Sequence, residues 1–172
     1  LDTAAKNISV TVKDNGDGTM SASVSDTATI NNSYKAGEIT VDPTAAATKF
    51  ANKNVSGTGF NAKDFTFKLA AVTSGAPMPT SDEATLNFSA AGTQAVPFGS
   101  IKYTDPGTYT YTVTETNAAA TGWTLDTDAH TINVVVVDNG DGTMSATVSD
   151  TASIDNSYKA GEITVDPTAA AT

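Results

Sequence analysis

The sequence contains no cysteine, so disulfide bonds cannot stabilise its fold. For a protein that works outside the cell, this absence raises the question of which other covalent bond could take their place. Leucine is scarce, no stretch repeats apolar residues with helical spacing, and no apolar run is long enough to cross a membrane. These absences argue against a helical domain and against membrane insertion of this segment.

Basic residues are also few. The chain has 9 lysines and arginines against 19 aspartates and glutamates, which gives a formal net charge of −10. An acidic surface repels phosphate backbones and anionic lipids, so nucleic acids and membrane surfaces are not expected as partners. Solubility is a sufficient explanation for the charge.

The residues that are abundant are threonine, valine, alanine, serine, asparagine, aspartate and glycine. Such a composition is typical of short β-strands joined by polar turns. Alternating patterns predict strands at residues 8–13, 19–24, 28–34, 49–55, 65–71, 84–89, 95–103, 108–115, 131–137, 143–148 and 152–158. Many short strands with frequent turns favour an all-β sandwich.

A long internal repeat organises the chain. Residues 1–48 match residues 125–172 at a constant offset of 124 (125 − 1), with differences only at positions 4, 6, 7, 9, 11, 13, 23, 29 and 31 of the first copy. Such identity indicates a tandem array. We therefore expect residues 1–34 to be the C-terminal strands of a preceding repeat and residues 35–158 to be one complete repeat. Its junction would lie at 35–48, and residues 159–172 would start the following repeat.

Each copy contains an Asn-Gly-Asp-Gly sequence between two predicted strands, beginning at Asn15 and Asn139. These residues tolerate positive φ angles, so the sequence predicts hairpin turns. Asp14, Asn15 and Asp17 could alternatively be calcium ligands. Their spacing does not fit an EF-hand loop, and the terminal glutamate of such a loop is missing.

Three polar residues fall on the inward faces of predicted strands: Lys53, Glu115 and Asn156. Burying them separately would cost several kcal/mol each, but they would be tolerated if they met. Burial lowers the pKa of a lysine and raises that of a glutamate, so both can become neutral. A neutral Lys53 amine could attack the Asn156 amide while Glu115 polarises its carbonyl and shuttles protons, which would release ammonia and leave an amide bond.

A plainer interpretation of the same residues is also available. Lys53 could lie at a strand edge with its ammonium in water, Glu115 could be an exposed acid near a loop, and Asn156 could be a turn residue. Strand periodicity alone does not decide between the two interpretations.

Three segments resemble the streptococcal-type pilin isopeptide-linkage repeat of Gram-positive surface proteins: ATKFANKNVSGTGFNAKDFTFKL, DPGTYTYTVTET and ASIDNSY. That family has a lysine four residues before a glycine, followed by an F-x-F strand; Lys53 and Gly57 match it. A G-x-Y-x-Y-x-V-x-E strand and a terminal [FI]-x-N-x-Y strand follow, which places Glu115 and Asn156 at the family's acid and amide positions. The resemblance covers nearly all of residues 49–158.

The resemblance implies an immunoglobulin-like sandwich of the collagen-adhesin B type (CnaB). It also implies an autocatalytic cross-link between Lys53 and Asn156, with Glu115 as the proton shuttle. The expected role is a structural stalk or pilus-shaft repeat outside a Gram-positive cell, with neighbouring repeats of the same fibre as partners and host surfaces or other cells as further candidates. The sequence leaves open whether repeats are joined in one chain or polymerised by a sortase.

Other features give weaker hypotheses. Asn32 matches Asn156, but no lysine or glutamate precedes it in the right position, so we expect it to have no cross-link within this chain. An alternative function is a glycan- or host-protein-binding adhesin module, with aromatic residues as a sugar-stacking platform: Tyr103, Tyr109, Tyr111 and Trp123. His130 is the only histidine and is Lys6 in the other copy. No metal, cofactor or multi-turnover enzyme activity is therefore expected.

Overall fold

The computed structural model describes residues 1–165 and residue 167, and these residues form strands and turns without a helix. None of them forms a helical segment suited to crossing a membrane. The chain divides between Lys35 and Ala36 into two compact units. The residues predicted to begin a third repeat lie partly outside the described residues, at 166 and 168–172.

The first unit contains one antiparallel hairpin, formed by β1 (Val10–Asp14) and β2 (Met20–Val24). The predicted hairpin is therefore confirmed. Its turn contains two glycines at positive φ, Gly16 and Gly18, and the side chains of Asp14 and Asp17 accept backbone N–H bonds within it. The acidic residues of the turn thus serve to close it.

The strand predicted at residues 28–34 is absent, and these residues are exposed. The matching segment of the second unit, Ala152–Tyr158, is strand β13 and pairs with β4 (Ala51–Ser56). Nearly the same sequence therefore adopts two states. A segment becomes a strand only when a partner strand accepts its backbone hydrogen bonds.

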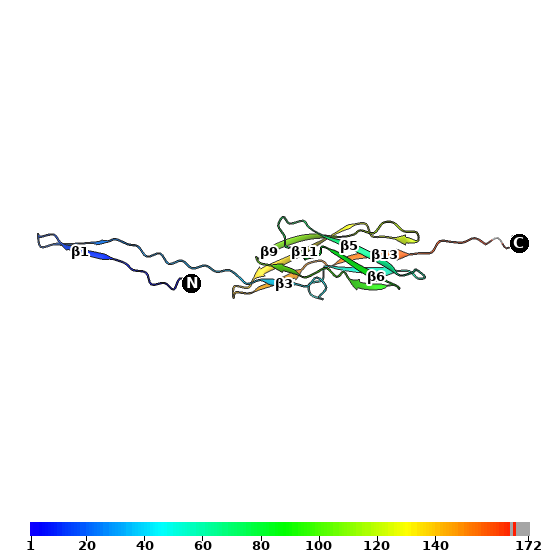
Figure 1. Ribbon diagram of the computed structural model, residues 1–172, viewed down its shortest axis with the longest axis horizontal. Coiled ribbons are helices and arrows are strands. Elements are labelled where there is room, and N and C mark those ends of the chain that lie inside the picture. Colours follow the sequence, from blue (N-terminus) through cyan, green and yellow to red (C-terminus); the bar gives the residue numbers. More distant parts are fainter. Residues whose placement is uncertain (166, 168–172) are drawn as a thin grey trace. The chain divides into compact units, whose positions relative to one another are not determined.

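The second unit contains the remaining strands. In addition to β4 and β13, they are β3 (Ile39–Val41), β5 (Lys63–Ala71), β6 (Glu83–Phe88), β7 (Gly92–Ala95), β8 (Ile101–Tyr103), β9 (Gly107–Glu115), β10 (Trp123–Thr124), β11 (Ala129–Asp138) and β12 (Met144–Val148). Figure 1 shows β5, β9, β11 and β13 gathered in one body.

Two sheets form the sandwich. One has the strand order β10-β13-β4-β7 and the other the order β12-β11-β9-β5-β6, while β3 and β8 form a separate pair. Their inward residues share one core, whose largest fully buried apolar side chains are Tyr103, Tyr111, Phe50, Phe65, Phe67, Leu69, Ile101, Ile132 and Ile154. The unit is thus the predicted all-β, immunoglobulin-like sandwich.

The first and last long strands of this unit lie side by side. β4 and β13 pair in parallel, with Lys53 opposite Ile154 and Val55 opposite Asn156. Parallel neighbours cannot be joined by a tight turn, so the chain between them crosses through the other sheet. This pairing brings together residues about a hundred positions apart in sequence.

The single strand predicted at residues 95–103 was wrong. β7 ends at Ala95, β8 begins at Ile101 in a different sheet, and residues 96–100 between them are not strand. Pro97 in this stretch lacks the N–H that a continuous strand would donate. The junction at 35–48 contains β3, which pairs with β8 and buries Val41 in the core. The junction is thus partly a piece of the sandwich.

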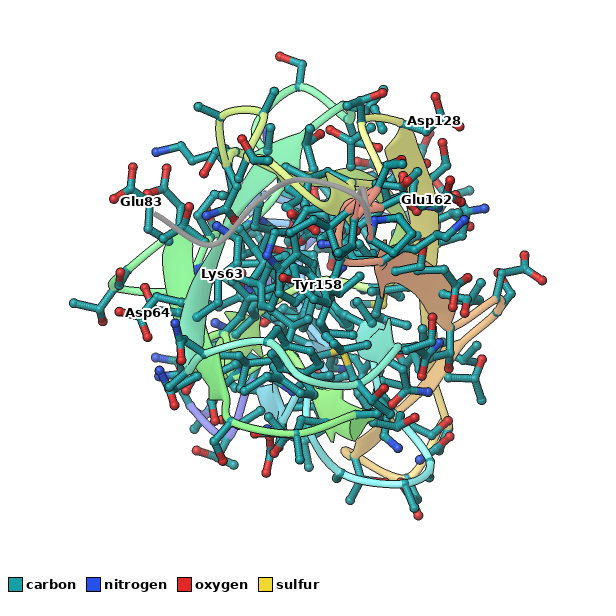
Figure 2. All side chains as sticks on the ribbon, turned by 90° about the vertical axis from the view of Figure 1, so that its right-hand side faces the viewer. Lys63, Asp64, Glu83, Asp128, Tyr158 and Glu162 are labelled. Carbon is teal, nitrogen blue, oxygen red and sulfur yellow. The ribbon has the colours of Figure 1, made fainter. Side chains whose placement is uncertain are left out.

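The acidic side chains lie mainly at the surface. In Figure 2, Glu83 and Asp128 lie at the periphery of the view, whereas Lys63 and Tyr158 lie closer to the centre. Glu83 and Asp128 are both exposed. The net negative charge is therefore carried largely outside the core, as expected for a soluble surface.

Candidate cross-linking site

Strand periodicity places each of the three predicted site residues in the core. On β4, β9 and β13 alternate residues are buried, and Lys53, Glu115 and Asn156 occupy buried positions with exposed fractions of 0%, 7% and 3%. These are the only buried charged or amide residues among those that the structure describes. The edge and turn positions of the plainer interpretation are therefore excluded.

The tertiary fold brings the three side chains together. Lys53 and Asn156 come from the paired strands β4 and β13, and Glu115 comes from β9 in the opposite sheet. The Lys53 Nζ atom lies 2.7 Å from Glu115 Oε2. The Asn156 Nδ2 atom donates to Glu115 Oε1 at 2.9 Å and lies 3.0 Å from Oε2. The carboxylate thus bridges the amine and the amide.

The Asn156 carbonyl oxygen has a separate partner. Its Oδ1 atom accepts a hydrogen bond of 2.7 Å from the backbone N–H of Asp126. The sequence had suggested that Glu115 would polarise this carbonyl, but Glu115 bonds the amide nitrogen instead. A backbone donor aimed at a carbonyl oxygen is the arrangement that stabilises an oxyanion during acyl transfer.

The lysine is held in an apolar environment. Its Nζ atom lies 4.9 Å from the centroid of the Phe65 ring, and Phe65 is itself fully buried. Burial lowers the pKa of Lys53, against the opposing effects of the hydrogen bond and charge of Glu115. A lower pKa favours the neutral amine, which is the nucleophilic form.

Asp126 is fixed in place by its own side chain. Its carboxylate accepts the backbone N–H bonds of Asp128 at 3.0 Å and Asp155 at 3.2 Å, and its Oδ2 lies 3.0 Å from His130 Nε2. Burial would raise the pKa of Asp126, but these hydrogen bonds outweigh it and lower that pKa. The anionic side chain therefore anchors the loop whose N–H reaches Asn156.

Sequence reasoning did not identify Asp126. The one available signal is the repeat, because Asp126 is retained as Asp2 while His130 becomes Lys6. Lys6 forms an ion pair of 2.8 Å with Asp2. A cationic or imidazole partner for the aspartate is thus present in both copies.

Gly57, the glycine of the family motif, allows close backbone contact beside the site. It has a φ of +98°, and a Cβ atom there would lie 2.1 Å from the backbone oxygen of Tyr158. Only glycine fits both constraints. This contact fixes the end of β13, two residues beyond Asn156.

Asn32, in the first unit, is exposed. Its Oδ1 atom accepts a 2.8 Å hydrogen bond from the backbone N–H of Asp2, in the same way that Asn156 accepts from Asp126. The described hydrogen bonds of Asn32 include none to a lysine or glutamate side chain.

The four aromatic residues proposed as a sugar platform do not form one exposed surface. Tyr103 and Tyr111 are fully buried, and their hydroxyl groups lie 3.0 Å apart. Trp123 is half-buried and packs against Phe65 at a centroid distance of 5.2 Å. Tyr103 and Tyr111 belong to the core of the sandwich.

Comparison with known proteins identifies one matching family and several similar solved structures. The family described as FctA, Spy0128-like isopeptide containing domain, matches residues 49–159. The major pilin protein T-13 of Streptococcus pyogenes is 20% identical, with a TM-score of 0.46 over 72% of this chain and 54% of that chain. A mutant of the major pilin of Streptococcus pyogenes is 16% identical, with a TM-score of 0.44 over 72% of this chain and 51% of that chain.

The matched region thus spans about half the length of each pilin. No curated protein sequence matches the chain significantly. The family match covers more than half of the residues and contains Lys53, Glu115 and Asn156. The chain belongs to the family of Spy0128-like isopeptide containing domains.

Proposed function

We propose that the complete repeat is a structural module of a bacterial cell-surface fibre of the pilus-shaft type, stabilised by an amide bond between Lys53 and Asn156. The main support for this proposal is that one buried carboxylate, Glu115, contacts both the Lys53 amine and the Asn156 amide. Membership in an isopeptide-domain family supports this role. The proposed setting is the outside of a Gram-positive cell, with neighbouring repeats as partners.

The reaction begins with a proton transfer. Glu115 takes a proton from the Lys53 ammonium across the 2.7 Å contact, which leaves a neutral amine and a carboxylic acid. The Lys53 Nζ atom then attacks Asn156 Cγ. Negative charge develops on Asn156 Oδ1, where the Asp126 N–H stabilises it.

The second stage expels ammonia. The Glu115 acid gives its proton to Asn156 Nδ2, which lies 2.9 Å from it, and then takes a proton from Nζ. The Cγ–Nδ2 bond breaks as the carbonyl re-forms, and ammonia leaves with all protons accounted for. The set is consumed in one turnover, so the reaction is a self-modification.

The strand arrangement gives the bond a mechanical role. β4 and β13 are parallel, so tension applied at the two ends of the repeat loads this pair in shear. A bond between Lys53 and Asn156 would carry the load past the intervening residues. It would also close a loop of about a hundred residues, for which chain entropy predicts a stabilisation of about 4–5 kcal/mol.

Intact-mass measurement under denaturing conditions tests the proposal. The bond removes one ammonia, so the chain should weigh about 17 Da less than its sequence predicts, and a protease digest should yield a branched peptide joining Lys53 to Asn156. Glu115→Ala should restore the full mass. A matched control, Glu83→Ala, alters an exposed glutamate and should keep the loss. A wild-type chain of full mass would rule out the cross-link.

A further inference from the structure

Two asparagines are followed directly by glycine, Asn15 and Asn139, and both lie in exposed hairpin turns. The backbone nitrogen that follows an asparagine can attack the side-chain Cγ atom and close a succinimide ring. Glycine favours this attack because it has no Cβ atom to obstruct the approach. Exposure supplies the water that completes the conversion. Both positions are therefore chemically predisposed to lose their amide group.

The reaction at Asn139 would run in two steps. The bond between Gly140 N and Asn139 Cγ forms, the Cγ–Nδ2 bond breaks, and the proton of the Gly140 N–H leaves with the amide nitrogen as ammonia. Water then opens the ring to aspartate or isoaspartate. Isoaspartate lengthens the backbone, because the chain then runs through the side chain. This would disturb the pairing of β11 with β12, where Asp138 lies opposite Met144.

Both ends of the Asn139 side-chain amide are bonded across the turn. Its Nδ2 atom donates to Thr143 Oγ1 at 2.9 Å, and its Oδ1 atom accepts from Ser145 Oγ at 3.0 Å. Attack on Cγ makes that carbon tetrahedral, which moves both atoms away from these partners. The hydrogen bonds therefore stabilise the planar amide against the reaction.

The nitrogen that would attack is also engaged. The Gly140 N–H donates to Asp138 Oδ1 at 2.8 Å. A backbone amide must lose its proton before it can attack, which leaves a negative charge on the nitrogen. An aspartate is anionic at neutral pH, and a second negative charge beside it is disfavoured. Asp138 therefore opposes formation of the nucleophile.

A second aspartate orients the threonine. Thr143 Oγ1 donates to Asp141 Oδ1 at 2.6 Å, which leaves its lone pairs to accept from Asn139. The hydrogen bonds that Thr143 donates lower the pKa of Asp141, so this carboxylate remains an acceptor. We call the bonds of Asn139 and Gly140 to Thr143, Ser145 and Asp138 the amide network.

The first hairpin contains the same amide network. Asn15 Nδ2 donates to Thr19 Oγ1 at 3.0 Å, and Ser21 Oγ donates to Asn15 Oδ1 at 3.1 Å. The Gly16 N–H donates to Asp14 Oδ1 at 2.8 Å. The two hairpins belong to different compact units. The network is therefore made by the residues of the turn and not by the rest of the sandwich.

We propose that Asn15 and Asn139 are latent deamidation sites, kept as amides by the aspartate, threonine and serine of their own hairpins. Where the amide network is broken, each asparagine converts to succinimide and then to aspartate or isoaspartate. This protection is independent of the proposed cross-link between Lys53 and Asn156. A succinimide and the cross-link both lack one ammonia, so peptide mapping must distinguish them.

The test incubates the full chain at physiological temperature and mildly alkaline pH. Peptide mapping and enzymatic methylation of isoaspartate measure conversion at each asparagine. A synthetic peptide of residues 137–142, which lacks the threonine and serine partners, gives the unprotected rate. Both asparagines in the folded chain should convert at least about tenfold more slowly than this peptide, because several hydrogen bonds must break.

Each hairpin serves as the internal control for the other. Thr143→Val with Ser145→Ala should speed conversion at Asn139 by about threefold to tenfold, and Asn15 in the same molecules should be unaffected. Thr19→Val with Ser21→Ala should reverse the pattern. Thr147→Val, an exposed threonine farther along β12, should change neither rate.

Three results would overturn the proposal. A wild-type chain that converts as fast as the peptide would show that the network gives no protection. Unchanged rates in both double variants would show that the threonine and serine are not the protecting groups. Faster conversion at both asparagines after a change in one hairpin would show that general unfolding, and not the local network, controls the reaction.

Discussion

At the scale of single residues, the proposed cross-linking reaction depends on three groups with different tasks. Glu115 contacts both side chains that would react, Lys53 would supply the amine, and the Asp126 backbone N–H contacts the carbonyl oxygen. The buried polar side chains that the structure describes all have hydrogen-bond partners. Removing one group therefore leaves others buried without a partner, which is costly.

The hydrogen bonds that hold the Asp126 side chain lead to a prediction about the rate of cross-link formation. Asp126→Ala keeps the backbone N–H but loses the hydrogen bonds that position it, so cross-link formation should slow by about tenfold or more. The measurement is the linked fraction against time after cell-free synthesis, followed by mass. Asp128→Ala, which introduces the residue found in the other copy (Ala4), should leave the rate unchanged. Equal rates for both variants would show that the carboxylate does not position the donor.

His130 can be tested by the natural exchange between copies. His130→Lys should preserve the rate, because Lys6 contacts Asp2 in the first unit. His130→Ala removes the contact with Asp126 and should slow the reaction by a few-fold. The same time course measures both variants, and a slow His130→Lys variant would contradict the assigned role.

The lowered pKa of Lys53 predicts a pH dependence in a chain that cannot cross-link. Asn156→Ala keeps Lys53 and Glu115 but has no amide to attack. Because burial holds the folded-state pKa of Lys53 below its ordinary value of 10.5, the unfolded chain binds more protons between the two pKa values. The free energy of unfolding should therefore rise as pH increases towards 10.5.

The control that isolates the contribution of Lys53 is the double variant Lys53→Met/Asn156→Ala, which has no titrating group at position 53. Denaturant unfolding of both variants across the alkaline range measures the difference in stability. A difference that stays constant or falls with rising pH would contradict the direction of the shift.

At the scale of elements, the closeness of β4 and β13 depends on the turn that follows β4. Gly57 has a φ of +98° and would place a Cβ atom 2.1 Å from the Tyr158 oxygen. Gly59 has a φ of +80° but has no atom within 4 Å of its Cβ position. Substitution of Gly57 therefore tests steric contact together with backbone strain, whereas substitution of Gly59 tests backbone strain alone.

We expect Gly57→Ala to destabilise the unit by about 3 kcal/mol, because it adds a clash to the backbone strain. Gly59→Ala should cost only the strain, about 1–2 kcal/mol. Equilibrium unfolding in the Asn156→Ala background, where no cross-link hides the effect, measures both. Similar costs for the two variants would show that the contact with Tyr158 is unimportant.

At the scale of the whole molecule, the proposed bond changes which part of the chain can be extended by force. With Lys53 linked to Asn156, tension bypasses residues 54–155. Without the bond, unfolding can also extend residues 54–155, which amount to about 350 Å of chain at about 3.5 Å per residue. Single-molecule pulling should therefore show this extension in Glu115→Ala and not in the wild-type chain. Equal extension in both would show that the bond carries no load.

Local sequence patterns were enough to predict which residues of each strand face inward. The two-residue period of β4, β9 and β13 is a local property of extended backbone, so it predicted inward positions for Lys53, Glu115 and Asn156, although the period alone left edge and turn positions open. The repeat and the family motifs then indicated their shared chemistry. The all-β class followed from composition and turn signals for the same local reason.

Which inward residues meet, and through which atoms, depends on the three-dimensional arrangement of the strands. The parallel register of β4 and β13 and the Asp126 N–H bond to Asn156 join residues distant in sequence, and no local period encodes such pairing. Residues 28–34 and 152–158 also show that strand formation depends on tertiary pairing. Their inward residues are identical, yet only the second segment is a strand, because only there do the described residues provide a partner strand.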